Sequence, residues 1–149
     1  MRVLVSKTDI ASVALLLCAA PSFSQGNEKP QCLSYEPNIV SLTGIIVTKT
    51  FPGPPNYAGV KKGDRGETAW ILELDAPVCI DEDKVDSDLN PAQTEIREIQ
   101  LVLTPERHNS YKRLLGKRVT ANGTLFGAHT GHHRTPVLLT VRTLKSSNE

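Results

Sequence analysis

Three of the four histidines in this chain, His129, His132 and His133, lie within five residues of one another. Imidazole is the side chain used most often both to bind transition metals and to transfer protons near neutral pH. The spacing H-x-x-H-H in a glycine-containing loop would let two or three imidazoles turn toward a zinc, copper or nickel ion. It differs from the helical H-E-x-x-H pattern, in which a glutamate acts as general base, so it does not identify a reaction.

Three interpretations of this loop, residues 127–136, compete. A transition metal such as zinc is the one cofactor that the pattern suggests, and Asp64 or Glu67 would then be helper ligands from another part of the chain. In a structural loop, Thr130, Thr135 and the ring nitrogens would instead hydrogen-bond to turn backbone. In the third interpretation the histidines contact an organic ligand or a protein.

A second unusual segment, residues 51–67, is rich in proline and glycine. Its prolines cannot donate to a regular hydrogen-bond ladder and argue against free disorder, so a long ordered loop is predicted. Phe51 and Tyr57 are candidates for stacking on a ligand, although anchoring the loop to the domain is the alternative. With the other loop, the candidate ligand residues are Phe51, Tyr57, His129, His132, His133 and Arg134.

The other sequence patterns do not indicate a catalytic or metal-binding role. No G-x-S-x-G elbow, P-loop or dinucleotide glycine pattern follows an expected strand, so an enzyme is less favoured than a binding module and no catalytic residue is assigned. The acidic run at 81–88 lacks the spacing, central glycine and closing glutamate of a calcium loop. Trp70 is expected in the core, and His108 receives no role.

The amino-terminal residues indicate export. Arg2 and Lys7 precede an apolar run at 10–20, and small residues follow near Ser24. This is the pattern of a secretory signal peptide, residues 1–24, and the run is about half the length needed to cross a bilayer. We therefore expect a secreted, periplasmic protein with no membrane span after cleavage, and Cys18 would leave with the signal.

The remaining 125 residues suffice for one domain and are too few for two well-formed ones. We expect a polar lead-in at 25–38, a single domain at 39–145 and a polar tail at 146–149. Of 17 basic and 16 acidic residues, 15 of each sign remain after cleavage. Nothing electrostatic then draws the protein to nucleic acid.

Two cysteines remain after cleavage, Cys32 before the first expected strand and Cys79 at the end of the second. An even cysteine count in an exported domain favours a disulfide, and two buried free thiols are the alternative. The bond would close a loop of about 48 residues and stabilise the fold by about 3 to 4 kcal/mol.

Alternating apolar residues predict five strands and one helix. The strands are expected at 39–51, with a bend or bulge at Gly44, at 68–74 ending near Pro77, at 96–103, at 118–126 and at 137–144. Thr104 as N-cap and Pro105 begin a short helix that Gly116 ends, with Tyr111, Leu114 and Leu115 as its buried stripe. Asn122–Gly123 would split the fourth strand if it formed a hairpin turn, which we consider the weaker interpretation.

A helix between the third and fourth of five strands is the order of an OB-fold, a small barrel, with another small mixed barrel as the alternative. In OB-folds, ligands lie over the second and third strands, between the loop after strand one and the loop between strands four and five. Residues 51–67 and 127–136 occupy those two positions, which predicts a ligand site between them.

The sequence GTLFGAHTGHHRTPVLL at 123–139 resembles a bacterial exported family with a domain of unknown function, DUF4431, whose members have the pattern GTLFxAHTGHHxTPVLL. The segments TFPGPPNY at 50–57 and WIL at 70–72 are similar to the same family. The resemblance implies no established activity. Many relatives have histidine in place of Gly127 and Arg134, so this chain lacks two possible metal ligands.

These observations favour an exported binding module for a small molecule, a glycan or an envelope protein. The competing class is a metal-binding protein or metal-dependent enzyme that uses His129, His132 and His133. The third is a structural or protein-interaction domain of the cell envelope.

Overall fold

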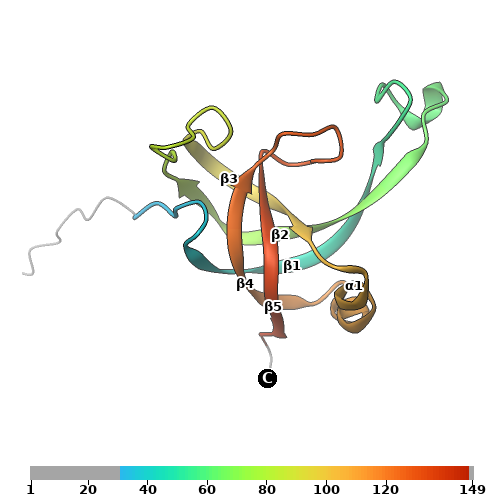
Figure 1. Cartoon of the computed structure of the whole chain (residues 1–149). Helices are drawn as coiled ribbons and strands as arrows, with labels where there is room; N and C mark the ends of the chain where they lie inside the picture. The colour runs from blue at the N-terminus through green and yellow to red at the C-terminus, as the bar shows by residue number, and fades with distance from the viewer. Residues whose placement is uncertain (1–30, 148–149) are drawn as a thin grey trace, which may run out of the picture.

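The computed structural model describes residues 31–147, which form a closed five-stranded barrel with one short α-helix (Figure 1). The strands are β1 (Ile39–Pro52), β2 (Gly66–Ile80), β3 (Gln93–Val102), β4 (Arg118–Gly127) and β5 (Val137–Ser146). Helix α1 (Pro105–Tyr111) lies between β3 and β4, and two short 3-10 turns are η1 (Val60–Lys62) and η2 (Lys112–Leu114). This arrangement confirms the predicted OB-like barrel.

The ring of strands runs β1-β2-β3-β5-β4 and closes between β4 and β1. All neighbours are antiparallel except β3 and β5, whose short parallel pairing joins Gln100–Val102 to Leu138–Thr140. Because a closed ring leaves few free strand edges, its loops rather than its edges are available for recognition.

The first strand bends at Gly44, where it pairs with both β4 and β2 before continuing with β2 alone. A Cβ atom at this position would stand 2.1 Å from the carbonyl oxygen of Glu73, so only glycine fits there. Beyond the bend, β1 and β2 form a curved hairpin that carries the proline loop away from the barrel (Figure 1).

The second strand is longer than the sequence predicts, because it passes Pro77 and ends at Ile80. The register between β2 and β3 shifts between Glu73 and Val78, so Pro77 lies at an irregularity in which no regular ladder bond is required of its nitrogen. The prediction that the strand ends near Pro77 was therefore wrong.

The helix starts at Pro105 as expected, but Thr104 makes no side-chain hydrogen bond to the backbone of the first turn. The following turn buries Leu114, and Gly116 adopts a φ of 75° and ends the segment. Arg107 donates from its guanidinium to the carbonyl oxygen of Val141 in β5. This hydrogen bond attaches α1 to β5 at a residue beyond the short parallel pairing of β3 with β5.

The core fills the barrel with aliphatic side chains, and Ile46, Leu72, Ile99, Leu125 and Leu139 are fully buried. The described part of the lead-in contributes more than expected, since Tyr35 is buried in this core and donates to the carbonyl oxygen of Pro91. Cys32 and Cys79 form the predicted disulfide, beside a bridge that pairs Leu33 with Ile80.

The fourth strand is continuous through Asn122–Gly123, where its register with β5 shifts in place of the alternative hairpin turn. The proposed signal peptide and residues 25–30 lie outside the described residues. Among residues 31–147, no helix is long and apolar enough to cross a membrane.

Candidate functional site

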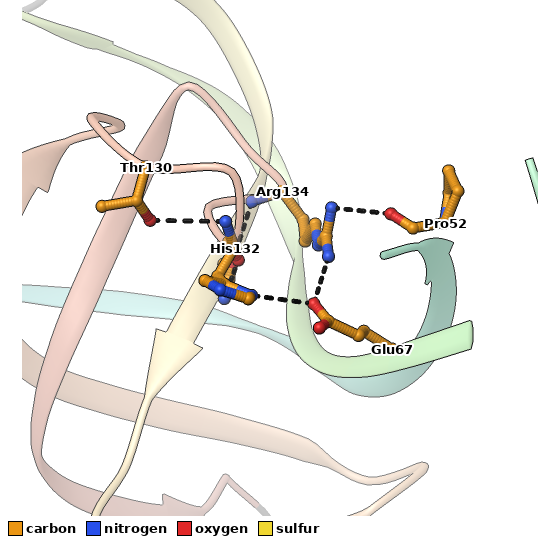
Figure 2. Close-up of polar contacts among 6 residues, drawn as sticks. Pro52, Glu67, Thr130, His132 and Arg134 are labelled. Atoms are coloured by element: carbon orange, nitrogen blue, oxygen red, sulfur yellow. Dashed lines mark hydrogen bonds and ion pairs between the residues drawn. The ribbon is translucent and has the colours of Figure 1, made fainter. Parts of the chain in front are cut away.

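One carboxylate, that of Glu67 at the start of β2, holds two side chains of the β4–β5 loop. Its Oε2 atom lies 2.9 Å from Nδ1 of His132 and accepts a hydrogen bond from the guanidinium of Arg134, as Figure 2 shows. The hydrogen bond from His132 first, and that from Arg134 next, lower the pKa of Glu67. Glu67 is therefore an ionised carboxylate at the centre of a three-residue hydrogen-bond network.

The backbone of the same loop is held by Gln100 of β3. The Gln100 side chain accepts from the Arg134 amide at 2.6 Å and donates to the His132 carbonyl at 3.3 Å. Its main-chain amide donates to the Thr135 hydroxyl, which in turn donates to the carbonyl of Val137. The loop is thus attached to the barrel through both side chains and backbone before any ligand arrives.

Arg134 joins the histidine loop to the proline loop. Its side chain is only 9% exposed, and it donates to the carbonyl oxygen of Pro52 at 3.0 Å (Figure 2). Its guanidinium carbon lies 5.7 Å from the ring centres of both Phe51 and Tyr57, which is the distance of a cation–π contact. Two candidate ligand residues, Phe51 and Tyr57, therefore contact a third, Arg134, although Tyr57 stays 40% exposed.

His129 and His133 have different partners from His132. Their rings pack edge to face with centres 4.6 Å apart, and both contact the ring of Phe126. The His129 amide donates to Nδ1 of His133 at 3.0 Å, so the His133 ring is an acceptor within the loop. Desolvation, followed by the charges of His129 and His132, lowers the pKa of His133.

The histidine loop does not form a metal cluster in the described part of the chain. There, no three histidine, cysteine, aspartate or glutamate side chains are placed to hold one ion. Of the two proposed helpers, Glu67 binds His132 and Arg134. Asp64 is buried and accepts from the backbone amides of Asn56, Ala58 and Gly59, which lower its pKa, so it holds the proline loop in shape.

A hollow of about 380 Å³ opens beside this network. Its walls come from the start of β2, from β3, from α1 and from the β4–β5 loop. The lining residues are Glu67, Thr68, Ala69, Trp70, Gln100, Leu101, His108, His132 and Arg134. Its size is at the lower end of the range of small-molecule sites.

Sequence reasoning missed His108 as a member of this site. Its half-buried ring packs edge to face on Trp70, with centres 4.7 Å apart, and both line the hollow. Gln100 was missed as well. The predicted ligand face over the second and third strands is the signal by which both could have been found. Gln100 lies in the third expected strand, and the helix that carries His108 follows that strand directly.

Residues 98–145 match the model of DUF4431, a domain of unknown function. The DUF4431 match confirms the resemblance that the histidine loop predicted, and it extends from β3 to β5. It includes Gln100, His108, His132 and Arg134, and the segments at 50–57 and 70–72 lie outside it. Neither the curated proteins nor the solved structures contain a match to the chain.

Proposed function

We propose that this protein is an exported binding module whose ligand occupies the hollow over β2 and β3. The observation that carries this proposal is that hydrogen bonds to Glu67 and Gln100 hold the β4–β5 loop in place at the rim of the hollow. A loop that is ordered before binding loses little conformational entropy when a ligand arrives, so small contacts suffice for affinity. The ligand is a small molecule rather than a polymer or a protein, because the hollow is only about 380 Å³.

Export is part of the proposal and has separate support. The Cys32–Cys79 bond is of the kind that persists in oxidising compartments. In a Gram-negative host, the full chain should be recovered from the periplasm without residues 1–24 and without free thiols. A version that lacks residues 1–24 should stay in the cytoplasm, and recovery of that version from the periplasm would contradict the assignment.

Ligand binding can be tested by NMR with a fragment set that contains organic acids, amines, neutral amides and monosaccharides. Trp70 is the only tryptophan of the chain, so its indole N–H resonance reports on the hollow without ambiguity. We expect at least one class of fragment to shift the Trp70 indole and the Gln100 side-chain amide, with a Kd on the order of 1 mM.

A matched pair of variants locates the binding. His132→Ala removes a side chain that lines the hollow, and His129→Ala removes one from the same loop that does not line it but packs on His133. Binding should weaken in the first variant and persist in the second. If fragments of every class leave Trp70 unmoved, or shift only the surface around Arg113 and Lys117 where a second cavity lies, the proposal fails.

A further inference from the structure

We infer that the hollow prefers a small organic anion, with an apolar body and one carboxylate or phosphate group placed between His108 and His132. This inference rests on the proposed function and names the ligand class of the same site. It uses one residue, His108, to which the sequence assigned no role.

The charges of the lining leave no net negative charge for a cation. Among the residues that the structure describes, Glu67 is the only carboxylate that lines the hollow, and its Oε2 atom accepts from both His132 and Arg134. The charge of Arg134 offsets that of Glu67. The lining therefore does not favour a cationic ligand by its charge.

The ring nitrogens of His108 and His132 can donate hydrogen bonds into the hollow. An ionised carboxylate only accepts hydrogen bonds, so Nδ1 of His132 carries the proton that points to Glu67. Nε2 of His132 then donates only when the ring holds a second proton. The ring of His108 makes no hydrogen bond to another described residue, although it contacts Trp70. Both imidazoles therefore keep a nitrogen that can donate to an anion.

The apolar side chains of the lining suit the hydrocarbon part of an organic ligand. Ala69, Trp70 and Leu101 line the hollow together with the polar groups. Burying hydrocarbon against them stabilises a bound organic molecule, and an inorganic ion has no apolar surface to bury. A compact organic body with one anionic group matches both parts of the lining.

The direction of the pH dependence follows from these groups. On α1, the charged residues next to His108 are Glu106 and Arg107, and the Arg107 guanidinium donates a hydrogen bond to the carbonyl oxygen of Val141. Across the hollow, His108 faces Glu67, His132 and Arg134, while β3 contributes only the uncharged Gln100 and Leu101. An anion that takes hydrogen bonds from the imidazoles favours their protonated forms, so affinity rises as the pH falls. A metal ion competes with those protons and shows the opposite trend.

The test uses Trp70 fluorescence on the full mature protein. The probes are cyclohexanecarboxylate, cyclohexyl phosphate and the neutral cyclohexanecarboxamide, none of which absorbs where tryptophan is excited. We expect cyclohexanecarboxylate, which is ionised at both values, to bind at least about five-fold more tightly at pH 6 than at pH 8, and the amide to bind weakly at both. Cyclohexyl phosphate itself takes up a proton near pH 6, so its affinity is compared with that of the carboxylate at a single pH. The two anions distinguish a carboxylate ligand from a phosphate ligand.

Variants then assign the effect to the two rings. His108→Gln and His132→Gln should each reduce the pH dependence, whereas His129→Gln should retain it, with melting temperatures recorded to show that all three fold. Equal binding of the amide and the carboxylate would overturn the inference and leave the binding module intact. Tighter zinc binding at pH 8 with no anion binding would overturn it in favour of a metal site. If no cyclohexyl probe binds, the inference fails, and the fragment set decides the proposed function separately.

Discussion

Arg134 shows how a residue chosen as a ligand contact can instead connect two loops. Its guanidinium binds the Glu67 carboxylate and the Pro52 carbonyl, and it lies against the rings of Phe51 and Tyr57. A planar group with several donors can make all of these contacts at once, and an ammonium group cannot. The charge at this position is therefore less important than its shape.

We predict that Arg134→Lys lowers the free energy of unfolding by about 2 kcal/mol, because charged hydrogen bonds and a cation–π contact are lost while the charge stays. Urea denaturation measures this change. Arg118→Lys is the matched control, since Arg118 forms an exposed ion pair with Asp75 and should change the stability by less than about 1 kcal/mol. Equal effects of the two substitutions would show that Arg134 does not connect the loops.

His133 accepts a hydrogen bond on Nδ1 from the His129 amide, and it can do so only while that nitrogen is unprotonated. Its pKa is lowered by desolvation first and by His129 and His132 next. Below about pH 6.5, the usual value in an unfolded chain, the unfolded state binds more protons at this site than the folded state. The stability that His133 contributes is thus present above that value and is lost as the pH falls from it through the lower pKa of the folded state.

We therefore predict that the melting temperature of the wild-type protein decreases from pH 7 to pH 5 more than that of His133→Asn. The asparagine side-chain oxygen replaces the Nδ1 acceptor and does not titrate. Thermal melts at several pH values measure the difference. Parallel curves for the two proteins would mean that protonation of His133 does not weaken the loop.

The sequence predicted which segments carry the site residues better than it predicted what each residue does. Composition alone singled out 51–67 and 127–136, and the structure joins them through Arg134. The role of a histidine depends on its neighbours in space, however. His132 meets Glu67 across 65 positions of sequence, and His108 meets Trp70 only because α1 packs beside β2. No local sequence pattern predicts these contacts.

At the scale of elements, the end of β4 is packed against the segment between β2 and β3. A Cβ atom at Gly127 would stand 1.9 Å from the carbonyl oxygen of Leu89, and the Gly127 amide donates to the Asn90 side chain at 2.8 Å. Gly127 therefore permits a close backbone approach. Any side chain at this position would require the segment around Leu89 to move.

We predict that Gly127→Ala lowers the free energy of unfolding by about 1 to 3 kcal/mol, as other overpacked positions do. Chemical denaturation measures the loss, and NMR should locate the shifts at residues 89 and 90. Gly66→Ala is the control, because its nearest contact is the Thr50 methyl group at 3.1 Å, which can move. An undisturbed Leu89 segment in Gly127→Ala would contradict the close approach.

Strand positions were largely predictable, because alternating side chains report directly on a half-buried strand. The bend at Gly44 was also predictable, since glycine within a strand marks a bulge or a close approach. The extension of β2 past Pro77 was not. It depends on a register shift against β3, which is a property of two strands and not of one.

For the molecule as a whole, the Cys32–Cys79 disulfide attaches the lead-in to the end of β2 across 47 positions of sequence. Loop-closure entropy predicts that replacing both cysteines by alanine costs about 4 kcal/mol of stability, chiefly by freeing the unfolded chain. Denaturation with and without reductant measures this loss. Reductant should lower the stability of the wild-type protein and leave the double variant unchanged, and a wild-type protein insensitive to reduction would contradict the prediction.

The sequence by itself determined the order of the five strands and the helix along the chain, the cysteine pair and the two loops that carry the site residues. These follow from local periodicity, turn residues and composition, which act over a few neighbouring positions. Only the tertiary structure decided that His129 and His133 pack together while His132 turns to Glu67, and that His108 and Trp70 share its hollow. Barrel closure brings these side chains together, and the partner of each depends on distances that sequence spacing does not contain.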